Sequence, residues 1–96
     1  MLDLNKVKEI LSVLKPELIS KYYVSSIGLF GSVVRGDFTA NSDIDIIVTF
    51  NRPVGMEFID LANELEEKLD RKVDLVSKNG VKEKYYQIIE PQIIYV

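Results

Sequence analysis

The chain contains no cysteine and no histidine among its 96 residues. The absence of cysteine excludes disulfides and metal sites built on thiolates. The absence of histidine excludes Ser-His and Cys-His nucleophilic pairs and the usual zinc sites. The side chains that remain for chemistry are carboxylates, lysines and hydroxyls, together with the backbone amides. Carboxylates favour hard cations, so a metal site in this chain is expected to hold Mg²⁺.

Long apolar runs and an excess of positive charge are also missing. No stretch is long and apolar enough to span a membrane, and residues 1–10 read as an amphipathic helix without a signal-peptide pattern. We therefore expect a cytoplasmic protein without membrane contact. The formal net charge is −3 and the pI is about 4.9, so we expect no stable binding of nucleic acid. The absence of a Walker-type phosphate loop argues against a P-loop NTPase.

The length of the chain limits its organisation. A chain of 96 residues predicts a single domain over residues 1–96. Apolar residues make up 47% of the chain and charged residues 28%, which is a globular composition. A domain of this size has room for one core, but not for a separate lobe that binds a large acceptor. We expect such an acceptor to be held partly by another chain.

Hydrophobic periodicity predicts alternating helices and strands. A helix over 4–15 is expected to end at Pro16, which starts a second short turn through Lys21. Further along the chain we expect strands at 24–30, 43–50 and 72–77, a short helix at 32–35 capped by Ser32, a loop at 36–41, and helices at 55–70 and 81–90. This alternation predicts an α/β fold with a small sheet flanked by helices.

The apolar segment from Ile93 to Val96 has two interpretations. It either covers the edge of the core or forms part of an interface with another molecule. We favour the interface, because an apolar segment left uncovered would be an exposed hydrophobic patch. The acidic residues of the helix at 55–70 lie opposite its apolar stripe, and we interpret them as a solvated face.

Three aspartates lie on expected strands. Asp43 and Asp45 are two residues apart, so both carboxylates leave the same face of a strand. Two carboxylates this close repel each other, and a divalent cation between them relieves the repulsion. Asp74 lies on the next strand, and it can reach the same cation if the two strands are neighbours. Paired metal ions held in this way stabilise both the attacking and the leaving oxygen of a phosphoryl displacement.

The dipeptide Gly31-Ser32 follows the first expected strand. A glycine lets the backbone approach a phosphate closely, and a strand that turns directly into a helix aims backbone amides at it. Ser32 adds a hydroxyl donor. Arg35 either pairs with a phosphate or holds the loop. A lone Gly-Ser pair is usually a simple turn, and an acidic pair at a strand start is usually solvated, so only the combination is informative.

The combined pattern G-S-x10-D-x-D is formed by Gly31, Ser32, Asp43 and Asp45. It resembles the signature of the DNA polymerase beta-like nucleotidyltransferase superfamily, whose third carboxylate would be Asp74 in VDLV. The resemblance runs from about Val24 to the end of the sequence, and the length is similar to that of minimal nucleotidyltransferase (MNT) proteins. The ending EPQIIYV differs from the E-G-V-[VL]-[LY]-Y type of ending in that family. The resemblance implies the nucleotidyltransferase fold, with a small mixed sheet flanked by helices as in the polymerase beta palm.

The same resemblance implies a function. By analogy, Gly31, Ser32 and Arg35 bind the nucleotide, Asp43 and Asp45 hold two Mg²⁺ ions, and Asp74 binds metal and acts as the general base. The substrate would be ATP, from which AMP passes to a hydroxyl group. MNT proteins are commonly paired with a small helical HEPN protein, and several are antitoxins that attach adenylyl groups to a tyrosine of that partner. This chain resembles such an antitoxin.

Two other functions are compatible with the sequence. In the first, the chain neutralises a HEPN protein by binding alone, with a vestigial site. In the second, it transfers a nucleotidyl group to a small molecule such as an aminoglycoside, or to an RNA end. Enzymes of the second kind usually carry an additional domain for the acceptor, and this chain has no room for one.

Overall fold

The computed structural model describes residues 2–96, and Met1 lies outside the described residues. The elements follow the order α1 (Leu4–Tyr22), β1 (Val24–Phe30), α2 (Ser32–Arg35), β2 (Ile44–Phe50), α3 (Met56–Leu69), β3 (Val73–Ser77), α4 (Glu83–Ile89), the 3₁₀ turn η1 (Glu90–Gln92) and β4 (Ile94–Tyr95). The strands form one sheet in the order β3-β2-β1-β4. The predicted α/β class with a small mixed sheet is confirmed.

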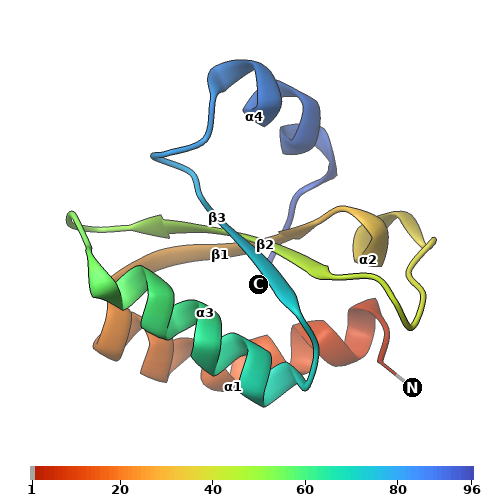
Figure 1. Cartoon of the computed structure of the whole chain (residues 1–96), viewed down its shortest axis with the longest axis horizontal. Helices are drawn as coiled ribbons and strands as arrows, with labels where there is room; N and C mark the ends of the chain where they lie inside the picture. Colours follow the sequence, from red (N-terminus) through yellow and green to blue (C-terminus); the bar gives the residue numbers. More distant parts are fainter. Residues whose placement is uncertain (1) are drawn as a thin grey trace.

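The sheet combines antiparallel and parallel pairs. Strand β1 pairs antiparallel with both β2 and β4, whereas β3 pairs parallel with β2. The parallel pair requires a crossover, which α3 supplies. Figure 1 shows α1 and α3 side by side on one face of the sheet and α4 on the other. Because both faces are covered, central strand β2 is apolar on both sides, as its sequence predicted.

Each face of the sheet has its own apolar cluster. The larger cluster joins α1 and α3 to one face of the sheet and is built from fully buried side chains such as Leu11, Ile46 and Leu65. The smaller cluster lies under α4 and consists of Phe30, Ile47 and Ile89. Over residues 2–96, none of the helices is both long enough and apolar enough to cross a bilayer.

The predicted helix break at Pro16 is wrong. Helix α1 runs without interruption from Leu4 to Tyr22 and contains Pro16 within it. Proline removes one main-chain hydrogen bond and disfavours a helix at this point. The apolar stripe nevertheless continues beyond it, because Leu18 and Tyr22 are buried in the same core as Leu11. The burial of this second half of the helix outweighs the local cost of the proline.

Residues 93–96 are part of the sheet of this chain. Ile94 and Tyr95 form strand β4, which pairs with Gly28 and Leu29 of β1. The N–H of Val96 donates to the carbonyl of Ile27 over 3.0 Å. The apolar segment therefore covers the edge of the core, as one of the two interpretations predicted. Its role in an interface stays a prediction, because β4 is an edge strand and Tyr95 is exposed.

A polar cluster fastens α1 to α3 outside the main core. The Glu64 carboxylate oxygen Oε1 accepts hydrogen bonds from Tyr22 Oη over 2.6 Å and from Lys21 Nζ over 2.8 Å. These two donors hold the pKa of Glu64 below its usual value, with Lys21 the larger cause. The second oxygen, Oε2, is buried without a hydrogen-bond partner among the described residues. The stabilisation from this cluster therefore depends on the two hydrogen bonds to Oε1.

Tyr22→Phe should lower the free energy of unfolding by about 1–2 kcal/mol, because it removes a hydrogen bond to a charged acceptor in a partly buried site. Urea denaturation measures the change. Tyr85→Phe is the matched control, since Tyr85 is exposed and its hydroxyl should contribute less than about 0.5 kcal/mol. Equal effects of the two substitutions would contradict a stabilising role for the Tyr22–Glu64 bond.

Candidate active site

The aspartates lie where the strands β1, β2 and β3 meet. Asp45, the second residue of β2, is in register with Phe30 of β1 and with Asp74 of β3. Residues in register on neighbouring strands project from the same face of a sheet. Asp45 and Asp74 therefore share the face that α4 covers further along β2. Asp43 is exposed and directly precedes this strand, so all three predicted carboxylates lie at one end of the sheet.

The half-buried carboxyl of Asp45 has a raised pKa of about 6. Burial is the largest cause, followed by the negative charges of Asp74 and Asp43, while the positive charge of Arg35 acts in the opposite direction. The three carboxylates are therefore close enough to repel one another. A cation between them would lower this repulsion.

The donor set suits a hard cation, because it offers only carboxylate oxygens. Within residues 2–96, however, no three acidic side chains converge into a preformed metal cage. Asp43 is exposed, so packing does not fix the direction of its side chain. The residues therefore fit Mg²⁺ in chemistry.

Gly31 connects β1 to α2 and lies directly against Asp45. Its φ angle is +76°, which favours glycine. A Cβ atom at this position would overlap Asp45 Oδ2 and would lie 2.9 Å from Asp45 Cγ. A glycine is required here both by the backbone conformation and by the contact. It brings the bend after β1 into contact with the carboxylate.

The short helix α2 begins at Ser32 itself, the residue that was predicted to cap it. Gly31 occupies the N-cap position, and Ser32 is the first helical residue, so the predicted capping role of Ser32 is wrong. The N–H groups of Val34 and Arg35 donate to the Gly31 carbonyl. The N–H groups of the first two helical residues have no partner within such a turn. The half-buried Ser32 begins this turn, beside the bend that contacts Asp45.

Arg35 ends α2 and lies near the aspartates. Its Nη2 atom is 3.5 Å from Asp37 Oδ2, and both side chains are more than half exposed. Its positive charge acts on the pKa of Asp45, so it lies within electrostatic range of the carboxylates. The structure thus brings Arg35 toward the predicted site. A direct contact with a nucleotide stays a prediction.

One contact at this site had no signal in the sequence. The side-chain oxygen Oε1 of Gln92 accepts a hydrogen bond from the Gly31 N–H over 2.8 Å. Gln92 belongs to the 3₁₀ turn after α4. Proline within this turn indicates a chain direction change, but no local pattern predicts which loop the glutamine reaches. The bend that carries Gly31 is therefore held from a distant part of the chain.

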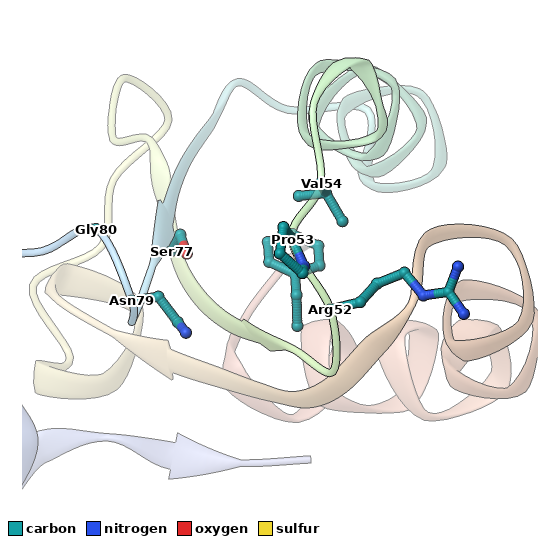
Figure 2. Close-up of a pocket in the computed structure, with 7 residues that line it drawn as sticks. Arg52, Pro53, Val54, Ser77, Asn79 and Gly80 are labelled. Atoms are coloured by element: carbon teal, nitrogen blue, oxygen red, sulfur yellow. The ribbon is translucent and has the colours of Figure 1, made fainter.

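The pocket in Figure 2 lies at the other end of the same strands. It has a volume of about 460 Å³ and is lined by Phe50, Arg52, Pro53, Val54, Ser77, Asn79 and Gly80. Figure 2 shows Ser77 and Asn79 on one side of the pocket and Pro53 and Val54 on the other. Phe50 is five residues from Asp45 along β2, which corresponds to about 16 Å. The pocket contains none of the predicted site residues.

Comparison with known proteins identifies the family of this chain. The nucleotidyltransferase domain family matches residues 6–95. The chain belongs to the nucleotidyltransferase family. This nucleotidyltransferase is 42% identical over 98 residues to a candidate protein adenylyltransferase of Methanocaldococcus jannaschii, covering all of both chains. It is 39% identical over 97 residues to the protein adenylyltransferase MntA of Thermococcus cleftensis, covering all of this chain and 98% of the relative.

Solved structures agree with this assignment. The nucleotidyltransferase is similar to a candidate minimal nucleotidyltransferase, with a TM-score of 0.83, 26% identity, and coverage of 97% of this chain and 95% of that one. It also matches a toxin-antitoxin protein solved with AMP-PNP, with a TM-score of 0.72 and 30% identity, covering 98% of this chain and 72% of that one.

A third structure contains a modified toxin. It is described as a tri-AMPylated Shewanella oneidensis HEPN toxin in complex with its MNT antitoxin. The TM-score is 0.62 and the identity 28%, with coverage of 96% of this chain and 66% of that one. These similarities confirm the fold and the class of enzyme predicted from the G-S-x10-D-x-D pattern.

Proposed function

We propose that this nucleotidyltransferase is a protein adenylyltransferase that transfers AMP from ATP to a tyrosine hydroxyl of a HEPN partner and thereby neutralises it. The observation that carries the proposal is the register of Asp45 with Asp74 beside the Gly31 bend. Two carboxylates and a close backbone approach lie at one end of the sheet, as phosphoryl transfer at paired metal ions requires. Relatives named protein adenylyltransferase support the choice of a protein as acceptor.

The proposed roles follow the geometry. Asp43 and Asp45 would hold two Mg²⁺ ions, and Asp74 would complete the set from the neighbouring strand. When bound, the ions would neutralise charge on the triphosphate and on the attacking and leaving oxygens. The Gly31 backbone would approach the phosphates closely because it lacks a side chain. Ser32 would donate its hydroxyl to a phosphate oxygen, and Arg35 would pair with the outer phosphates.

The transfer itself is a displacement at the α-phosphorus. The acceptor hydroxyl oxygen forms a bond to that phosphorus while the bond to pyrophosphate breaks. Asp74 would accept the proton of the hydroxyl, since it is exposed and in register with Asp45. Asp45 is suited to hold a cation, because its repulsion by Asp74 and Asp43 is relieved by positive charge. Asp43 and Asp45 would thus hold metal, whereas Asp74 would both hold metal and accept the proton.

The acceptor is proposed from the named relatives and from the structural neighbours of this chain. The described residues form one sheet with helices on both faces, and a protein acceptor supplies its own fold to present a tyrosine. Structures of similar antitoxins contain a HEPN toxin, in one case tri-AMPylated. A nucleotide as co-substrate is supported by the similar protein solved with AMP-PNP.

Intact mass spectrometry tests the proposal. The purified protein is mixed with a HEPN protein encoded beside it, ATP and Mg²⁺, and the double variant Asp43→Ala/Asp45→Ala is run in parallel. We expect a mass gain of one or more adenylyl groups on the partner with the wild type and none with the variant. A partner that binds both forms stably and gains no mass from either would reject adenylylation and favour neutralisation by binding alone.

A further inference from the structure

We infer that Arg71 is a positioning residue for the carboxylate of Asp43, an inference that rests on the proposed nucleotidyl-transfer site. Arg71 lies in the short connection between α3 and β3. It is half-buried, and it contacts the loop that leads into β2. It therefore links the start of β3, which carries Asp74, to the loop before β2, which carries Asp43.

Arg71 contacts this loop at three residues. Its Nη2 atom donates to the carbonyl of Thr39 and to the carbonyl of Ser42, each over 2.7 Å. The guanidinium carbon also lies 4.4 Å from the centre of the Phe38 ring. Both acceptors are main-chain atoms, so these bonds fix the path of the backbone.

The bond to Ser42 acts directly on the candidate metal ligand. The Ser42 carbonyl belongs to the peptide group that continues into Asp43, so holding this oxygen fixes the orientation of that peptide plane. One residue further on, the Ile44 N–H donates to the Lys72 carbonyl over 2.9 Å. The backbone on both sides of Asp43 is thus bound to the start of β3. The side chain of Asp43, which is exposed, therefore starts from a fixed main-chain position.

An arginine is better suited to this position than a lysine. A single planar guanidinium nitrogen can donate to two carbonyls while the face of the group stacks on an aromatic ring. A lysine ammonium keeps the charge but not the plane, so it can reach a carbonyl without stacking on Phe38 in the same way. Arg71→Lys should therefore retain part of the effect, which separates geometry from charge.

The chain offers a matched control. Arg52 also stacks on an aromatic ring, with its guanidinium carbon 4.1 Å from the centre of Tyr23. It follows β2 at the end opposite to Asp45. Arg52→Ala removes the same kind of side chain and the same kind of stacking, but no contact with the loop before Asp43.

The test measures binding of Mn²⁺, used as a probe for Mg²⁺, by electron paramagnetic resonance on the full chain. Wild type, Arg71→Ala, Arg71→Lys, Arg52→Ala and Asp43→Ala/Asp45→Ala are compared. Arg71→Ala should weaken Mn²⁺ binding by about tenfold, as is typical when the support of a metal ligand is removed. Arg71→Lys should be intermediate, Arg52→Ala should match the wild type, and millimolar guanidinium should partly restore Arg71→Ala.

Hydrogen exchange distinguishes positioning from general destabilisation. In Arg71→Ala, faster exchange should be confined to the loop at 37–43, with β1 and α1 unchanged. Wild-type Mn²⁺ affinity in Arg71→Ala, or weaker affinity accompanied by faster exchange throughout the sheet, would overturn the inference while leaving the proposed site intact. Wild-type binding no tighter than that of Asp43→Ala/Asp45→Ala would instead reject the metal site itself, and the role of Arg71 with it.

Discussion

Asp45→Asn should reduce nucleotidyl transfer by about 10³-fold or more, because it removes a charge that holds the metal ions against the reacting phosphate. Asparagine is nearly the same size, so the packing against Gly31 is retained. The rate is measured as transfer of labelled AMP from ATP to the partner protein. A variant that retains more than about a tenth of the wild-type rate would show that Asp45 is not a metal ligand in the reaction.

The same substitution should stabilise the cation-free protein at neutral pH. The pKa of Asp45 is raised from 3.8 to about 6, so the folded state binds the proton more tightly than the unfolded state does. The resulting stabilisation is fully present below the unfolded pKa and is lost as the pH rises through the folded pKa. At neutral pH the ionised group opposes folding. Asparagine removes this cost. We expect the free energy of unfolding to rise by about 1 kcal/mol, after allowance for screening by water at this half-buried group.

Urea denaturation with EDTA present tests the sign of this effect. The stability advantage of Asp45→Asn should shrink between about pH 7.5 and about pH 5, as the wild-type carboxyl becomes protonated. Asp37→Asn provides a control, because Asp37 is an exposed aspartate in the loop before β2. An advantage of Asp45→Asn that grew as the pH fell would contradict repulsion among the three aspartates. Loss of activity together with a gain in stability is the expected signature of a site built at a cost to the fold.

Gly31→Ala should destabilise the protein by about 2–5 kcal/mol and abolish transfer, because strain and overlap act together. The φ angle of +76° and ψ angle of −151° suit only glycine. The added methyl group would overlap the Asp45 carboxylate. The overlap is relieved only if the bend or the carboxylate moves, and either movement separates the proposed phosphate-binding backbone from the metal ligands. Urea denaturation and the transfer assay measure the two effects.

Gly36→Ala isolates the contribution of backbone strain. Gly36 also has a positive φ angle of +92°, but a Cβ atom there would meet nothing within 4 Å. Its substitution should cost about 1–2 kcal/mol from the left-handed backbone alone. Gly36→Ala should retain more transfer activity than Gly31→Ala when both are assayed under conditions in which each variant is folded. Similar activities for the two variants would mean that contact between Gly31 and Asp45 is not required for the reaction.

The parts of the fold that the sequence predicted were those with strong local periodicity. The alternation of Ile44, Ile46 and Val48 with Asp45 and Ile47 predicted both the strand and its two covered faces, and the buried residues agree. The same period of two predicts that Asp43 and Asp45 lie on one side, which stays a prediction because Asp43 precedes β2. Whether Asp74 lies beside Asp45 depends on the order of the strands in the sheet, which the local sequence pattern does not determine. The parallel pairing of β2 with β3 decided this question.

Several features that the sequence did not predict depend on partners that are distant in the chain. Pro16 indicates a helix end by every local rule, and only the burial of Leu18 and Tyr22 against the rest of the fold explains why the helix continues. The edge position of β4 depends on a partner strand more than sixty residues earlier. Gln92 and Arg71 make their contacts through side chains that carry no motif. Each depends on loop geometry that only the folded chain provides.

The strand order has a consequence for how the site forms during folding. Asp45 lies on β2, and Gly31 and Asp43 directly flank the antiparallel pair of β1 and β2. We expect this pair to form before β3 joins it, because its residues in register are closer in sequence than those of β2 and β3. Asp74 arrives only when the crossover through α3 docks β3, a short strand at the sheet edge, beside β2. The repulsion between Asp45 and Asp74 would therefore arise only when β3 docks beside β2, and it would oppose the docking. A bound cation would reverse this opposition, so the ion needed for chemistry would also hold the last strand of the site in place.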